Sequence, residues 1–146
     1  MMNFNFKLEK VLKYKKTIEN YKKNQYGTVQ RRLNNEEDKL RTFNQYKNNL
    51  KNEKNLSATK TKVGDLMMYN NYINHVATKI KFQEEVITET KEELEEIKEE
   101  LIIALKEKKI FEKLKENEYK EYLYQLKKQE EKQIDTLVSY KTSAHQ

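Results

Sequence analysis

Few residues in this sequence have the types and spacing that catalysis or metal binding requires. The two histidines, His75 and His145, are isolated from each other and from any His-Glu metal pair, and the chain has no cysteine. It also has no Gly-rich phosphate loop and no nucleophile motif. The glutamates between residues 92 and 100 resemble paired catalytic carboxylates, but a solvated helix face offers no pocket that encloses them. We therefore predict no enzyme activity, no metal site and no cofactor.

The first part of the chain has the charge that nucleic-acid binding needs. Residues 1–62 hold 16 Lys and Arg against 6 Asp and Glu, and several tyrosines are interspersed among them: Tyr14, Tyr21, Tyr26 and Tyr46. Phosphate binding needs little more than cations on one face. However, residues 63–146 hold 18 acidic against 14 basic residues, and they would cancel much of this field if they lay alongside. Nucleic-acid binding is therefore an alternative, and we expect no nucleic acid among the partners.

One stretch determines the architecture that must position any functional residue. Between residues 66 and 104, steps of three and four select a line of uncharged and mostly apolar residues: Leu66, Tyr69, Ile73, Val76, Ile80, Gln83, Ile87, Thr90, Leu94, Ile97, Leu101 and Ala104. This is a heptad repeat with positions a and d filled, without Gly or Pro. Such a narrow stripe predicts a coiled-coil helix, because a helix on a globular core shows a wider apolar face. A partner helix is required, and it can lie in the same chain.

A weaker period predicts a first helix over residues 4–56. Its seam, the line of residues that faces the partner helix, is expected to contain Val11, Tyr14, Ile18, Tyr21, Val29, Leu33, Leu40, Phe43 and Leu50. Glu36 and Lys47 take further seam positions, and Gly27 lies near an irregularity of the heptad. The period is lost between Asn55 and Asp65, where Ser57, Thr59, Thr61 and Gly64 predict a turn over about residues 57–65. Asp65 is positioned to cap a second helix, expected over residues 66–141.

These patterns predict an all-α protein in which one coiled-coil hairpin spans residues 1–146. A turn near Thr61 pairs residues whose numbers sum to about 122, which places Lys22 beside Glu100 and Tyr46 beside Val76. The rival arrangement is a parallel homodimer of one continuous helix. The second helix is the longer and should project beyond the first, because Phe4 pairs near Glu118. The projecting part carries its own apolar stripe: Leu123, Leu126, Leu137 and Tyr140. An exposed stripe of this kind calls for another protein or a self-association partner.

The location of the protein follows from what the sequence does not contain. No apolar run has the length of a membrane span, and the N-terminus lacks the hydrophobic block of a signal peptide. We therefore expect a cytoplasmic protein.

Three short motifs resemble those of the FliJ family, which belongs to the bacterial flagellar type III protein export apparatus. They are Phe4-x-Phe6-x-Leu8-Glu9-Lys10-Val11-Leu12-x-Tyr14, Tyr72-Ile73 and Glu107-Lys108-Lys109. The resemblance implies a non-catalytic stalk and adaptor at the cytoplasmic face of the membrane, at the flagellar base. It implies as partners the export ATPase FliI with its regulator FliH, the export gate protein FlhA, and export chaperones. Association with the membrane would be peripheral and through these partners. The alternative is a generic cytoplasmic coiled-coil scaffold or a chaperone-like protein.

The resemblance also implies two contact surfaces. The gate patch, near the turn, consists of Phe43, Tyr46, Leu50, Tyr72 and Val76. Lys39, Lys79 and Gln83 depart from the family pattern at one edge of this patch. Insertion into the ATPase ring is expected of the end that bears both termini: Phe4, Phe6, Leu123, Leu126, Leu137 and Tyr140. Because Phe43, Leu50 and Val76 also fit the heptads, these three can equally be core residues, whereas Tyr46 and Tyr72 fall off the seam.

Overall fold

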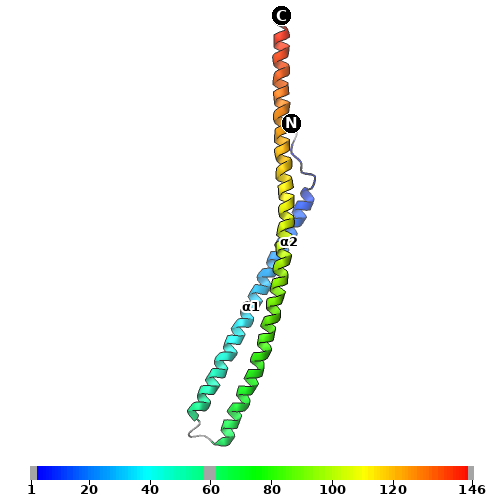
Figure 1. Cartoon of the computed structure of the whole chain (residues 1–146). Coiled ribbons are helices and arrows are strands. Elements are labelled where there is room, and N and C mark those ends of the chain that lie inside the picture. Colours follow the sequence, from blue (N-terminus) through cyan, green and yellow to red (C-terminus); the bar gives the residue numbers. More distant parts are fainter. Residues whose placement is uncertain (1–2, 58–61, 145–146) are drawn as a thin grey trace. The chain divides into compact units, whose positions relative to one another are not determined.

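The computed structural model describes residues 3–57 and 62–144, which form two helices (Figure 1). Helix α1 spans Glu9–Ser57 and helix α2 spans Val63–Ala144, with 49 and 82 residues. They pack against each other in antiparallel directions, which confirms the predicted hairpin with a longer second helix. The predicted turn at 57–65 falls partly on residues 58–61, which lie outside the described residues, as does His145.

The contacts divide the chain into two compact units. The central unit is Tyr21–Leu101, and the terminal unit combines the residues up to Asn20 with those from Ile102 onward. Each unit contains one part of α1 and one part of α2. The prediction that the whole chain is a single hairpin domain stays a prediction.

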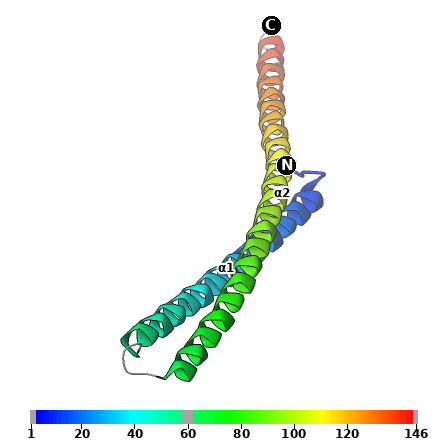
Figure 2. The ribbon, with the colours of Figure 1, turned by 60° about the horizontal axis from the view of Figure 1, so that its bottom comes forward.

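In the central unit, α1 and α2 run side by side and bury a narrow apolar seam (Figure 2). Next to the turn, Leu50, Val76 and Ile80 form a buried cluster, against which pack Leu40, Phe43, Tyr69 and Ile73. Farther along, the seam buries Val29, Leu33, Ile87 and Ile97. On α2, every residue of the predicted heptad line within this unit is buried or half-buried. The predicted period and face of this stretch are therefore confirmed.

Ion pairs across the central unit establish the register of the two helices. The amine of Lys22 lies 2.8 Å from the carboxylate of Glu100, the pair that the sequence predicts. Arg32 pairs with Glu93 in the same manner, one side chain from each helix. Both pairs are partly exposed, so each contributes at most about 1 kcal/mol to stability. Their main effect is to favour this register over shifted ones.

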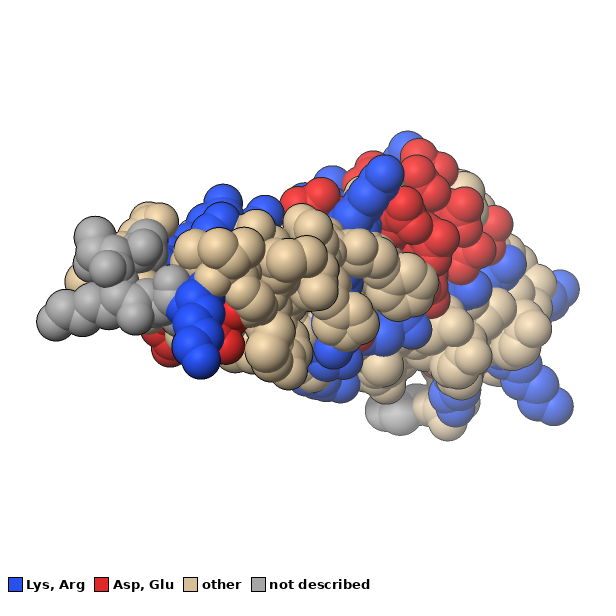
Figure 3. Space-filling model, turned by 90° about the horizontal axis from the view of Figure 1, so that it is seen from below, with Lys and Arg blue, Asp and Glu red and all other residues tan. Residues whose placement is uncertain are grey.

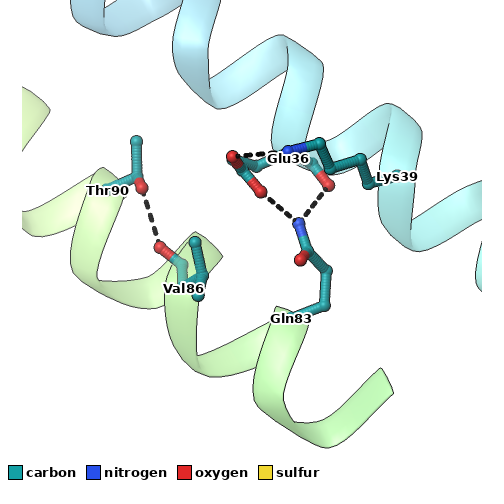
Figure 4. Close-up of polar contacts among 5 residues, drawn as sticks. All are labelled: Glu36, Lys39, Gln83, Val86 and Thr90. Atoms are coloured by element: carbon teal, nitrogen blue, oxygen red, sulfur yellow. Dashed lines mark hydrogen bonds and ion pairs between the residues drawn. The ribbon is translucent and has the colours of Figure 1, made fainter. Parts of the chain in front are cut away.

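A polar layer interrupts the apolar seam of the central unit (Figure 4). The buried Gln83 amide donates hydrogen bonds to the backbone carbonyl of Glu36, at 2.9 Å, and to its carboxylate. The Glu36 carboxylate also lies 3.3 Å from the amine of Lys39. About two turns farther along α2, the buried Thr90 donates to the carbonyl of Val86. Because these buried polar groups are satisfied, the layer is tolerated within the seam.

The terminal unit packs an extended N-terminal segment and the first turns of α1 against α2. The ring of Phe4 lies 5.1 Å from that of Tyr119 and 5.6 Å from that of Tyr122, centroid to centroid. Phe6 and Leu12 are buried, and Leu12 is the most deeply buried large side chain among the described residues. These contacts anchor the segment that precedes α1, which begins at Glu9 rather than near residue 4.

Charged pairs flank this terminal core. Lys15 pairs with Glu107 at 2.9 Å, and Lys115 pairs with Glu9 at 2.8 Å. The hydrogen bond from Lys115 lowers the pKa of Glu9 from its ordinary value. The acidic side chain also stands in the first turn of α1, where it interacts favourably with the helix dipole.

The structure corrects two of the predictions. Tyr14 and Tyr21 do not lie in the seam, because their side chains are 63% and 60% exposed. The seam instead passes through Leu12, Lys15 and neighbouring half-buried charged residues. Asp65 does not cap the second helix, because α2 begins at Val63 and Asp65 lies within its first turn. Its backbone N–H donates to the carbonyl of Lys62, and its charge favours the helix N-terminus.

Candidate interaction surfaces

Between the two helices near the turn lies a groove of about 400 Å³. Its lining is mostly aromatic and apolar, with an acidic residue from each helix: Tyr46, Leu50, Met68, Tyr69, Tyr72, Glu53, Asp65 and Ser57. Tyr46 comes from α1 and Tyr72 from α2, and their side chains are 50% and 52% exposed. The hairpin therefore brings these two tyrosines to one groove, where aromatic side chains are available to a partner protein.

The other members of the gate patch lie inside the hairpin. Leu50 and Val76 are buried in the core cluster, and Phe43 packs against that cluster. Their heptad positions explain this burial. The exposed part of the patch consequently reduces to Tyr46 and Tyr72. Exposed neighbours that sequence reasoning did not single out extend the apolar surface of this end: Leu56, Val63, Met67 and Met68.

A second, open groove lies beside the core cluster. It is about 580 Å³ and is lined by Lys39, Phe43, His75, Thr78, Lys79, Phe82 and Gln83. It contains the three residues that depart from the family pattern. Gln83 is committed to the hydrogen bonds with Glu36, and its bond to the carboxylate is the main cause of the lowered pKa of the Glu36 carboxyl. Gln83 therefore acts in helix packing, whereas Phe82, 65% exposed, is open to contact.

The aromatic residues of the N-terminus are internal contacts of the terminal unit. Phe6 is 4% exposed and Phe4 packs on Tyr119 and Tyr122, so neither presents a free ring at this end. The remaining ring-insertion candidates form the terminal stripe, Leu123, Leu126, Leu137 and Tyr140. Of these, Leu137 and Tyr140 are 60% and 74% exposed. Every residue from Lys127 to Ala144 is exposed, and this segment is the orange-to-red end of α2 in Figure 1.

The charge distribution bears on the nucleic-acid alternative. On the face that Figure 3 shows, most of the visible acidic side chains gather in one large cluster at the upper right, while Lys and Arg side chains are spread over this face. Within the central unit, the cations Lys22 and Arg32 are each paired with a glutamate of α2. The acidic helix thus lies directly against the basic one. This arrangement weakens the field that would attract phosphates.

Among residues 3–57 and 62–144, no group of three or more His, Cys, Asp or Glu side chains is placed to hold a metal ion. The described helices contain no segment both long and apolar enough to cross a bilayer. The two grooves are open surfaces between the helices.

Comparison with protein families agrees with this description. The sequence model of the family described as "Flagellar FliJ protein" matches residues 4–146. No curated protein and no solved structure matches the chain with significance.

Proposed function

The chain belongs to the flagellar FliJ protein family, and from this premise we propose that it is a stalk and adaptor bridging the export ATPase ring and the export gate. Membership makes it a flagellar export-related protein, and the family is a non-enzymatic component of export. The match over residues 4–146 is the observation that carries the proposal, because it includes both helices from end to end.

The proposed partners are FliI with its regulator FliH at one end, FlhA at the other, and export chaperones. The proposed location is the cytoplasmic face of the membrane at the flagellar base, with membrane association only through these proteins. The groove lined by Tyr46 and Tyr72, which we call the tyrosine groove, supports a contact with FlhA, because exposed aromatic side chains are frequent binding hot spots. The exposed members of the terminal stripe, Leu123, Leu137 and Tyr140, support a contact with the ATPase ring. Phe4 and Phe6 would act there by holding the terminal unit together.

The double variant Tyr46→Ala/Tyr72→Ala tests this proposal. Both rings are half exposed, so each truncation should change the free energy of unfolding by only about 0.5 kcal/mol. A truncated aromatic hot spot can cost about 2 kcal/mol or more in binding. We therefore expect melting like that of the wild type, much weaker binding to purified FlhA, and reduced swimming motility of a complemented deletion strain.

Tyr14→Ala/Tyr21→Ala is the matched control, because it removes two rings of similar exposure from elsewhere on α1. It should bind FlhA and support motility like the wild type. A second control, Ile80→Ala, removes a seam residue that is 8% exposed and should lower the melting temperature. A folded Tyr46→Ala/Tyr72→Ala variant with full FlhA binding would remove the gate contact from these positions.

A further inference from the structure

Besides the groove with Tyr46 and Tyr72 and the terminal stripe, another exposed apolar surface lies on α2 within the terminal unit. We call it the isoleucine stripe: Ile103, Ile110 and Leu114, which are 57%, 58% and 40% exposed. Their spacing of seven and four residues places them on one helix face. The seam residue Ala104, 5% exposed, marks the face that packs against α1, and at about 100° per residue the isoleucine stripe lies about a quarter to a third of a turn around the helix from it, beside that face. Neither the gate patch nor the terminal stripe includes it.

Lysines accompany the isoleucine stripe along one side. Lys106, Lys109 and Lys113 are exposed and lie between or beside the apolar residues. Within the described part of the chain, Lys106 and Lys109 form no ion pair. Lys113 has only an exposed pair at 3.6 Å with Glu116 of the same helix, which contributes little.

The lysines on the inward side of the same segment behave differently. Lys108 pairs with Glu19 at 3.6 Å and Lys115 pairs with Glu9 at 2.8 Å, and both glutamates belong to α1. The fold therefore neutralises the cations that face α1 and leaves those beside the isoleucine stripe without an acidic partner on another helix. An apolar line with these cations along one side is complementary to an apolar line with acids along the facing side.

We propose that this face docks an acidic amphipathic helix of another protein, which would pack as a third helix on the terminal unit. A helix is the fitting shape because spacing of seven and four residues matches the apolar repeat of a coiled-coil partner. The stripe extends over residues 103–114, about 17 Å at about 1.5 Å per residue. So short a contact suits a transient interface, with the lysines selecting the partner by charge.

A second copy of this chain does not have the required chemistry. The acidic segment of α2 is Glu84–Glu100, and every exposed residue in it is polar. The exposed apolar segment from Leu123 to Ala144 carries lysines as well as acids, so it is not acidic. Among the described residues, no segment combines an exposed apolar stripe with acidic flanks. The occupant must therefore come from a different protein.

The test uses the full chain and two synthetic helical peptides of about three heptads, with the same leucine seam and flanks of either Glu or Lys. Binding is followed by fluorescence anisotropy. We expect the Glu peptide to bind and the Lys peptide not to bind. Ile103→Ser/Ile110→Ser should weaken binding of the Glu peptide about tenfold or more, with unchanged circular dichroism, because both side chains are exposed.

Charge reversal separates recognition from general stickiness. Lys106→Glu/Lys113→Glu should weaken binding of the Glu peptide about fivefold or more and create binding of the Lys peptide, because charges at the rim of an interface select partners by sign. Lys127→Glu/Lys132→Glu, a matched pair of exposed lysines farther along α2, should change neither affinity. Rising salt should weaken the wild-type interaction.

Three results would overturn the proposal. Equal binding of the two peptides would show that charge does not select the partner. Dimerisation of the chain in analytical ultracentrifugation, lost in Ile110→Ser, would assign the face to a second copy. Binding to phosphatidylglycerol vesicles without binding to the Glu peptide would assign it to a membrane surface. Because the stripe is separate from the tyrosine groove, these outcomes do not depend on the FlhA and motility tests.

Discussion

Leu12 should contribute more to the stability of the terminal unit than Tyr14 does, although the apolar period of the sequence places Tyr14, and not Leu12, in the seam. Leu12 is 1% exposed and Tyr14 is 63% exposed. Leu12→Ala removes three buried carbon groups, at about 0.8 kcal/mol each, or roughly 2.5 kcal/mol of transfer free energy. A cavity term adds to this, but two helices can partly close the gap. The expected loss of unfolding free energy is therefore near the lower end of the usual range of about 2–5 kcal/mol.

Tyr14→Ala is the matched comparison, because it truncates a larger side chain two residues away in the same helix. Its ring is mostly in solvent, so the change should stay within about 0.5 kcal/mol. In urea unfolding followed by far-UV circular dichroism, the midpoint of Leu12→Ala should lie about 1–2 M below that of the wild type, at an m-value of about 2 kcal/mol/M. The midpoint of Tyr14→Ala should equal that of the wild type.

Hydrogen exchange should locate the loss of stability. Leu12 belongs to the terminal unit, so Leu12→Ala should speed exchange in residues 9–20 and 102–122 before it does so around Leu50 and Val76. A Tyr14→Ala variant that loses as much stability as Leu12→Ala would refute this packing. A Leu12→Ala variant that loses less than about 1 kcal/mol of unfolding free energy would refute it as well, because truncating a buried leucine costs more than that.

Three further predictions concern pH, register and helix propensity. The hydrogen bond from Gln83 lowers the pKa of Glu36, so the stability that this carboxylate contributes is fully present above its ordinary pKa of about 4.3 and is lost as the pH falls through the lowered value. Urea unfolding between about pH 6 and about pH 3 should therefore show a smaller acid-induced loss for Glu36→Gln than for the wild type. Lys22→Glu and Glu100→Lys should each destabilise by less than about 1 kcal/mol, and the double reversal should restore stability by re-forming the cross-helix pair, as a double-mutant cycle would show. Gly27→Ala should raise the free energy of unfolding by up to about 1 kcal/mol in the same urea assay, because the site is helical and an added Cβ meets no atom within 4 Å.

The register and the seam of α2 could be predicted because each rests on a repeated signal. The heptad from Leu66 to Ala104 contains enough apolar residues to define its face, and a one-turn shift would break the match between Lys22 and Glu100. The exposure of Tyr46 and Tyr72 followed from the same period, since both fall off the seam. What the sequence did not show is that the two rings, 26 residues apart, line a single groove.

The N-terminal half of α1 could not be predicted in the same way. Its seam contains charged residues, among them Lys15, Glu19 and Lys22, which a search for apolar residues passes over. They are half-buried because their charged ends pair with Glu107, Lys108 and Glu100 of α2 while their aliphatic stems cover the interface. Only the facing helix supplies those partners.

The sequence by itself therefore determined the helical hairpin, its register and the face of α2 that is buried, because a long apolar period and opposite charges encode all three locally. Tertiary structure alone decided which residues of the N-terminal half of α1 face inward, that Phe4 and Phe6 are internal contacts, and that Gln83 joins Glu36 across the seam. The physical reason is that a polar or aromatic side chain is buried only where another segment satisfies its charge, hydrogen bonds or ring. That segment lies tens of residues away in the chain.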